Sequence, residues 1–292
     1  MKVNKIALGT VQFGMDYGIS NKRGKIPRDE VFEILKEASE SGIDTIDTAY
    51  LYGESETVIG DFIKKHKKQF KVVTKSSACE IEQMEDLFEI SLKKLNIGRV
   101  YGYLIHNFQH YKENPKMWDI LEKLKAENKI QKIGLSLYYP SELEYLINKK
   151  IKIDIIQVPY SLFDRRFEPF FNELKNRNVE IHVRSVFLQG LVFKNLEELD
   201  GYFAKIKEKI SALNSLSMKY NIPIGAICLN FAILDSSVDK VVVGIDSIKN
   251  FKENISALNF LTDVENILQE LSQFKEDDEN LILPVNWKVR TP

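Results

Sequence analysis

Short apolar segments alternate with amphipathic helical segments along nearly the whole chain. The pattern predicts strands at residues 5–9, 44–47, 71–75, 99–107, 130–136, 153–158, 179–185 and 240–244. Between the strands, apolar residues recur at i, i+3 and i+4, the spacing of one face of a helix. The first such helix follows Pro27, places Val31, Ile34 and Leu35 on one face, and ends at Gly42.

Eight strand–helix units fit either an open doubly wound sheet or a closed (β/α)8 barrel. An open sheet gathers its ligand groups at one switch point, whereas every strand of a barrel ends at the same mouth. Seven of the eight predicted strands end in small or polar residues, which are Gly9 and Thr10, Asp47, Lys75, His106, Ser136, Gln157, and Arg184 and Ser185. This even distribution predicts an α/β protein with a TIM-barrel fold, a single domain over residues 1–292. We expect an extension from about residue 262, with one more helix.

The composition excludes several classes of protein. Lys plus Arg is 41 and Asp plus Glu is 42, so the net charge is −1 and there is no basic field to hold a nucleic acid or an anionic membrane. No window approaches the ~18 apolar residues of a membrane span, and the N-terminal segment lacks the apolar core of a signal peptide. The two cysteines, Cys79 and Cys228, provide no disulfide framework. We therefore expect a soluble cytoplasmic protein, a monomer or a small homo-oligomer.

Four of the polar groups would form a reactive site if they share one mouth. A free tyrosine has a pKa of about 10, and a nearby ammonium lowers that value. Lys75 could lower the pKa of Tyr52 in this way, with Asp47 as the partner that a buried lysine needs. His106 could bind the same substrate oxygen. The four groups predict proton delivery to a carbonyl oxygen, and a nicotinamide would have to supply the hydride because no side chain can.

Each of these residues also has an ordinary structural explanation. Asp47 could cap a turn, Tyr52 could lie in the core or at the rim, Lys75 could reach solvent, and His106 could be a core histidine. Their joint occurrence at the ends of strands two, three and four favours the functional explanation. His106 and His110 have the i, i+4 spacing of a helical metal pair, but no third ligand accompanies them, so we expect no metal site.

Five segments, in order over nearly the whole chain, resemble the aldo-keto reductase superfamily: DTAYLYGESE (47–56), VVTKSS (72–77), YLIHN (103–107), IGLS (133–136) and IQVPYS (156–161). The resemblance implies a (β/α)8 barrel that binds NADP(H) at its mouth without a Rossmann motif. It implies that Asp47, Tyr52, Lys75 and His106 are the catalytic tetrad. Tyr52 would then be the general acid when an aldehyde or ketone is reduced to an alcohol.

The resemblance also implies contacts with the nicotinamide half of the cofactor. Gly9 and Thr10 match positions near the nicotinamide, and Ser136 and Gln157 match residues that bind its carboxamide. Leu137 follows Ser136 where the family usually has asparagine. The family often stacks an aromatic residue on the nicotinamide at the end of strand seven; here Arg184 could stack instead, with Ser185 near the pyrophosphate.

The eighth strand departs from the family at the adenosine end. Many members have a lysine and an arginine that hold the 2′-phosphate of NADP(H), where this chain has Gly244 and Asn250. Asp246 would repel a phosphate, although Lys249 or Lys252 could compensate. Asn254 matches an asparagine that contacts adenine. The resemblance implies NADP(H), and NAD(H) remains possible.

The loops at the predicted mouth suit a small carbonyl substrate, such as a hydroxylated or phosphorylated sugar derivative. Residues 14–27 and 108–115 are polar loops, Tyr138 and Tyr139 add aromatic surface, and 159–166 adds two arginines. The apolar segment 187–192 either walls the pocket or packs on the barrel. Two other functions stay open: a cofactor-binding redox-sensing or regulatory subunit with little turnover, and a sugar epimerase that uses retained NADP.

Overall fold

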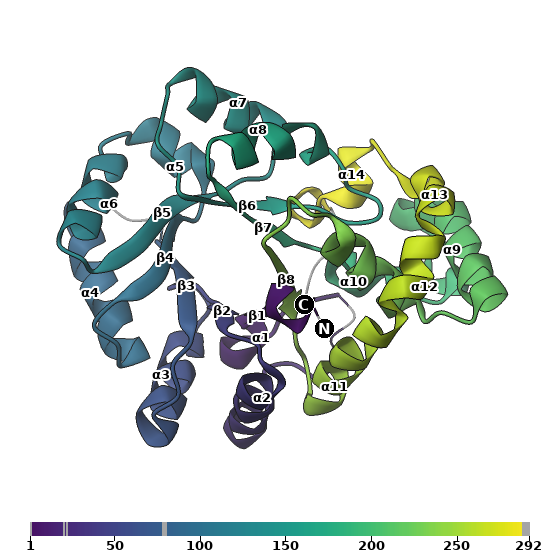
Figure 1. Ribbon diagram of the computed structural model, residues 1–292, viewed down its shortest axis with the longest axis horizontal. Helices are drawn as coiled ribbons and strands as arrows, with labels where there is room; N and C mark the ends of the chain where they lie inside the picture. The colour runs from purple at the N-terminus through teal and green to yellow at the C-terminus, as the bar shows by residue number, and fades with distance from the viewer. Residues whose placement is uncertain (1, 20, 22, 78–80, 288–292) are drawn as a thin grey trace.

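In the computed structural model, which describes residues 2–19, 21, 23–77 and 81–287, parallel strands close into a barrel in sequence order. Helices surround the ring of strands on its outside (Figure 1). The (β/α)8 barrel predicted from the sequence is therefore confirmed. The strands are β1 (Ile6–Gly9), β2 (Thr45–Asp47), β3 (Lys71–Lys75), β4 (Val100–Ile105), β5 (Ile130–Ser136), β6 (Ile155–Pro159), β7 (Glu180–Arg184) and β8 (Lys240–Gly244).

The helices bury the apolar faces that the sequence pattern predicts. In α2 (Arg28–Ser41), Val31, Ile34 and Leu35 are fully buried, and the helix ends at Gly42, whose φ of 89° favours glycine. The other helices between the strands are α1 (Val11–Gly14), α3 (Ser55–His66), α4 (Met84–Leu95), α5 (Phe108–Glu113), α6 (Met117–Ala126), α7 (Pro140–Asn148), α8 (Phe171–Asn176), α9 (Lys207–Tyr220) and α10 (Ile224–Leu234). After β8 come α11 (Ile248–Ser256), α12 (Leu261–Asn266), α13 (Leu268–Leu271) and α14 (Glu279–Ile282).

Two local predictions were wrong. Residues 108–115 were expected to be a loop, but α5 occupies most of them, and the Asn107 side chain caps it by accepting a hydrogen bond from the Gln109 amide at 2.7 Å. Helix α4 ends at Leu95 rather than near Gly98, because the next residue, Asn96, adopts the left-handed conformation, with φ of 53°.

The extension after residue 262 is also different from the single helix that was expected. It is divided into short helices, the first of which, α12, packs against α10 (Figure 1). The polar segment 275–278, KEDD, lies between α13 and α14 and has no apolar side chain to pack against the barrel. After it, Trp287 packs edge-on against Phe203 at 5.0 Å and donates a hydrogen bond to the Leu281 carbonyl.

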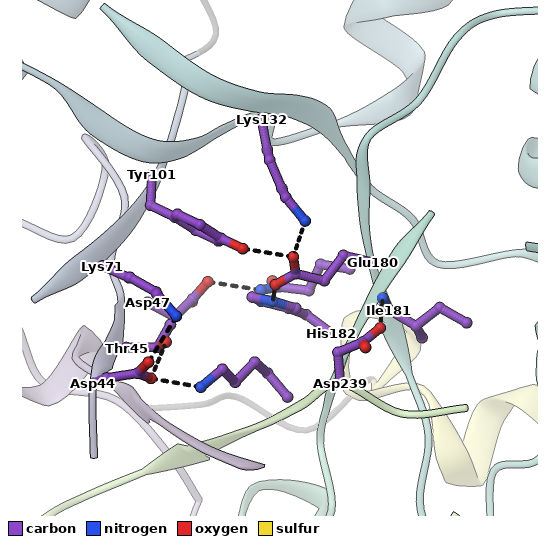
Figure 2. A network of polar contacts seen from close by, with 12 residues as sticks. Asp44, Thr45, Asp47, Lys71, Tyr101, Lys132, Glu180, Ile181, His182 and Asp239 are labelled. Carbon is purple, nitrogen blue, oxygen red and sulfur yellow. Dashed lines mark hydrogen bonds and ion pairs between the residues drawn. The ribbon is translucent and has the colours of Figure 1, made fainter. Parts of the chain in front are cut away.

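Charged side chains fill the end of the barrel at which the strands begin. Lys71 and Lys240, the first residues of β3 and β8, both donate to the carboxylate of Asp44, at 2.8 and 2.6 Å. Glu180, the first residue of β7, accepts hydrogen bonds from Tyr101, Lys132 and His182. Figure 2 shows these contacts around Asp44 and Glu180. Because they lie at the strand starts, they close the end opposite the expected mouth, where this fold concentrates stability rather than chemistry.

Candidate active site

A cavity of about 250 Å³ opens at the carboxyl ends of the strands. Three of the four expected catalytic residues line it: Asp47, Tyr52 and His106. It is also lined by seven of the nine expected cofactor residues, which are Gly9, Thr10, Ser136, Gln157, Arg184, Ser185 and Gly244. The barrel thus brings most of the predicted site residues to one place.

Lys75 lies behind this wall and has no exposed surface. Its ammonium donates to Oδ1 of Asp47 at 2.6 Å and to the Thr48 carbonyl at 2.9 Å. The other carboxylate oxygen of Asp47 accepts a hydrogen bond from the Gln157 side chain at 2.7 Å. A buried ion pair survives only when such additional bonds satisfy it. Asp47 therefore fixes the ammonium and the Gln157 amide around one carboxylate.

Tyr52 is carried by a tight turn between β2 and α3. Gly53 in this turn has φ of 55°, and a Cβ there would lie 2.4 Å from the Gly14 carbonyl oxygen, so only glycine fits. The turn holds the Tyr52 ring with its centroid 5.2 Å from the Lys75 ammonium and 5.8 Å from the His106 ring. This close approach explains why a glycine follows the tyrosine in the sequence.

The protonation of the site differs from one expectation. Burial and then the Asp47 carboxylate raise the pKa of Tyr52 above its ordinary value, so the prediction that Lys75 lowers it was wrong. Burial is the larger cause, because it disfavours the charged phenolate. Burial and the nearby Lys75 lower the pKa of His106 to about 3. At neutral pH the site therefore has a protonated phenol next to a neutral imidazole.

Hydroxyl groups hold the first two strand ends together. The Thr10 side chain donates to the Asp47 carbonyl at 2.9 Å, and its amide donates to the same oxygen at 3.1 Å. Ser55 lies 2.9 Å from the Thr10 hydroxyl and 3.0 Å from that of Thr48. Thr10 therefore lines the cavity and also holds the backbone of Asp47 in place through two hydrogen bonds.

Arg184 occupies the end of β7 with its guanidinium 4.2 Å from the centroid of the Tyr138 ring. It also donates to the Leu137 carbonyl at 3.0 Å. Leu137, at the position where an amide side chain was expected, is completely buried and does not line the cavity. One face of the Arg184 guanidinium, the planar group that could stack on a ligand, therefore already lies on the Tyr138 ring.

Two expected cofactor residues, Lys249 and Asn254, do not line the cavity. The Lys249 side chain is 83% exposed, and its ammonium lies 3.8 Å from Glu253. Asn254 is buried and donates to the Asn250 side chain at 3.3 Å. Both belong to α11. Lys249 points to solvent, whereas Asn254 lies on the same face of the helix as Asn250, one turn further along, and reaches Asn250 rather than the cavity.

The segment after β7 both walls the cavity and packs on the barrel. Phe187 and Gln189 line the cavity, whereas Leu188 and Leu191 are buried in the core. Gln189 donates to the Tyr17 hydroxyl at 2.8 Å, which joins this segment to the loop after β1 across the mouth.

Polar groups of residues 14–27, expected to hold substrate, are largely used within that region. Asp16 accepts from the Lys25 amide at 2.7 Å, and Asn21 donates to the Tyr17 and Gly24 carbonyls. Arg23 pairs with Glu30 at 2.8 Å. Lys22 lies outside the described residues. The two arginines of 159–166 are similarly engaged, since Arg165 donates to the Leu271 carbonyl and Arg166 pairs with Asp164 and Glu279.

Sequence reasoning missed Gln12, in the short helix α1 beside β8. Its Oε1 atom is buried without a partner, as is Nδ1 of His106, and both residues line the cavity. A bound polar molecule such as a nicotinamide nucleotide would complete these hydrogen bonds, so the cavity fits such a group. The only signal in the sequence was its position, three residues after the end of β1.

Two other searches covered the described part of the chain. It contains no group of three or more histidine, cysteine, aspartate or glutamate side chains that could hold a metal ion. None of its helices is both long and apolar enough to cross a membrane. Cys228 is a buried free thiol whose burial raises its pKa to about 12, while Cys79 lies outside the described residues.

A closed parallel barrel with a buried lysine–aspartate pair beside a tyrosine and a histidine defines an oxidoreductase of the aldo-keto reductase type. The Aldo/keto reductase family model matches residues 5–273. The chain therefore belongs to the aldo/keto reductase family, which the sequence resemblance had indicated.

Relatives agree with this assignment. The uncharacterized oxidoreductase YqkF of Bacillus subtilis is 23% identical, and the match covers 95% of this chain and 94% of that protein. The aldo-keto reductase YhdN of the same organism is 26% identical over 58% of this chain and 53% of that protein. The solved structure of aldo-keto reductase AKR11C1 from Bacillus halodurans, in its holo form, is similar with a TM-score of 0.76. It is 22% identical and covers 95% of each chain, which shows a shared fold.

Proposed function

We propose that this protein reduces an aldehyde or ketone to an alcohol, using a nicotinamide cofactor and Tyr52 as the general acid. The proposal rests mainly on the position of the Tyr52 ring. Tyr52 lines the same cavity as His106, and the ammonium of the buried Lys75–Asp47 pair lies 5.2 Å from the centroid of its ring. A reduced nicotinamide, when bound, supplies the hydride that side chains cannot supply.

The roles of the chain's own groups follow from their protonation. Tyr52 remains protonated, because burial and Asp47 raise its pKa. The raised pKa also makes it a weak acid, so its proton would move to the carbonyl oxygen only as the carbon accepts hydride and that oxygen becomes a strongly basic alkoxide. The phenolate left behind would be stabilised by the Lys75 ammonium, which the ion pair with Asp47 holds in place. A neutral His106 would bind the same oxygen and orient the substrate.

Gly9, Thr10, Ser136 and Gln157 would hold the nicotinamide end of the cofactor. Arg184 and Ser185 would lie along its middle. Lys249 and Asn254, which do not line the cavity, are not part of this proposal. Aromatic side chains at the mouth, Tyr17, Tyr138 and Phe187, would contact the body of the substrate. Because the arginines of the mouth loops are paired, we favour an uncharged hydroxylated carbonyl, such as a sugar aldehyde, over a phosphorylated one.

Two measurements on the purified protein test the proposal. Fluorescence titration with reduced nicotinamide nucleotides should show saturable binding. Oxidation of the bound nucleotide should then require an added carbonyl compound, with sugar aldehydes, keto-sugars, their phosphate esters and aromatic aldehydes tested separately. Binding without turnover on any carbonyl would instead support a redox-sensing subunit. Tight retention of the cofactor with no net oxidation would support an epimerase.

A further inference from the structure

The cavity has two chemically different ends. At one end are Tyr52, His106 and Ser136. At the other, the connection from β8 to α11 contributes Gly244, Asp246 and Asn250. A nicotinamide placed at the first end belongs to a dinucleotide several times longer than its ring, so the rest of the molecule must continue along the cavity.

The wall toward α11 leaves room for this continuation. Gly9 and Gly244 are neighbours in the β1–β8 register, and neither has a side chain to fill the cavity. Gln12 lies against Gly244, within 3.4 Å of the position that a Cβ would occupy, and its Oε1 atom is buried without a partner. A buried acceptor facing this wall indicates a ligand with hydrogen-bond donors, such as hydroxyl or amide groups.

The N-terminus of α11 would ordinarily attract a phosphate, because its amide groups point outward with the positive end of the helix dipole. In this chain an internal carboxylate already occupies it. Glu30 of α2 accepts a hydrogen bond from the Ile248 amide at 3.0 Å. Ser247 caps the helix and accepts from the Asn250 amide at 3.1 Å. An incoming phosphate would therefore meet a negative charge there.

The cations near this end are neutralised as well. Arg23 forms a two-pronged contact with Glu30, at 3.1 and 2.8 Å, and this contact holds the pKa of Glu30 below its ordinary value. On α11, Lys249 is near Glu253 and Lys252 is near Glu37, at 3.8 and 3.9 Å. Helix α2 packs against α11, and through Glu30 it places one carboxylate at the start of α11, next to the end of the cavity where a 2′-phosphate would have to bind.

Asp246 completes this arrangement. Asp246 lines the cavity, and one of its carboxylate oxygens accepts a hydrogen bond from the Ser247 hydroxyl at 2.9 Å. A carboxylate in such a position accepts hydrogen bonds from the hydroxyls of an unmodified ribose and repels a phosphate on the same ribose.

We propose that Glu30 and Asp246 make this protein bind NAD(H) in preference to NADP(H). The inference rests on the proposed function, because it requires a nicotinamide nucleotide to occupy the cavity. It reverses the cofactor that the family resemblance implies, and it assigns the selectivity to two carboxylates rather than to the missing lysine and arginine alone.

The test is a fluorescence titration of the intact protein with NADH and NADPH in parallel, at one fixed salt concentration. We expect NADH to bind at least about tenfold more tightly, as one unfavourable charge contact at close range can produce. Glu30→Gln and Asp246→Asn each remove one negative charge while keeping the shape of the side chain. Each should lower the dissociation constant for NADPH by about tenfold and change that for NADH much less.

Glu33→Gln is the matched control, because Glu33 lies on the same helix as Glu30 but is exposed to solvent. It should leave both dissociation constants unchanged. Thermal unfolding of each variant shows whether the chain is folded. If Glu30→Gln does not fold, Asp246→Asn still tests the inference.

The outcomes separate this inference from the proposed function. Tighter or equal binding of NADPH by the wild-type protein, together with carbonyl reduction, would overturn the inference and leave the function intact. A preference for NADH that neither variant changes would overturn the assignment to Glu30 and Asp246. Failure to bind either nucleotide would overturn both proposals.

Discussion

The ammonium of Lys75 lies 2.6 Å from Oδ1 of Asp47, and the two side chains are only 1% and 4% exposed. A lysine at a strand end would normally extend its charge into water. Here the barrel interior prevents this, and the charge is held next to the ring of a tyrosine that faces the cavity. We therefore expect both the stability of the site and its proposed chemistry to depend on this ion pair.

Removing one partner of the pair should be costly. Lys75→Met leaves the Asp47 carboxylate buried without its cation, and should lower the free energy of unfolding by about 3–5 kcal/mol. Lys71→Met, on the same strand, removes a half-exposed partner of Asp44 and should cost no more than about 1 kcal/mol. Urea denaturation of both variants measures the difference. Equal losses would show that burial of the pair has no special importance.

Tyr52→Phe should remove the proton donor without changing the shape of the cavity. We expect the turnover number for carbonyl reduction to fall by about 10²–10⁴-fold, the range that general acid catalysis contributes. The dissociation constant for the nucleotide should stay within about twofold, because the ring remains. Steady-state kinetics and fluorescence titration separate the two effects. Wild-type turnover in the variant would remove Tyr52 from the acid role.

Gly14→Ala should disturb the turn that carries Tyr52. A Cβ on Gly14 would lie 1.8 Å from the Tyr52 carbonyl oxygen, so the turn must move away from Lys75. Overpacking of this kind costs about 1–3 kcal/mol, and activity should fall more than nucleotide binding. Gly98→Ala is the control, because nothing lies within 4 Å of its Cβ position. If both variants melt and turn over like the wild type, the close contact is not restrictive.

His106 should stay neutral across the physiological pH range. Its pKa is lowered to about 3, whereas an unfolded chain binds the proton near the ordinary value of about 6.5. Between these values the unfolded state binds more protons, so folding stability should decrease as the pH falls below about 6.5. His106→Gln should reduce this dependence. NMR titration of the imidazole provides a direct check, and a midpoint near 6.5 would contradict the assignment.

Arg184→Ala should weaken nucleotide binding by about tenfold, because it removes a planar cation that lies over Tyr138 at the cavity wall. Arg184→Lys should not restore binding, since an ammonium lacks the planar face and the fork of donors. Fluorescence titration of both variants with the preferred nucleotide tests this. Full rescue by lysine would mean that only the charge of Arg184 matters.

The alternation of short apolar segments with helical periodicity determined the fold, since each of the predicted strands is present in the described barrel. The periodicity was sufficient because each helix must bury one apolar face on the strands. It failed where local chemistry decides the structure. Asn107 caps α5 through a side-chain hydrogen bond, and the acidic segment 275–278 interrupts the last helical region.

The sequence by itself determined which residues end the strands, and thus which polar groups reach the mouth. Only the tertiary structure decided how they are paired, because the partners are far apart in the chain. Asp47 binds Lys75 and Gln157, Glu30 occupies the start of α11, and Lys249 is turned outward. The raised pKa of Tyr52 has the same origin, since burial and the charge of Asp47 exist only once the barrel has closed.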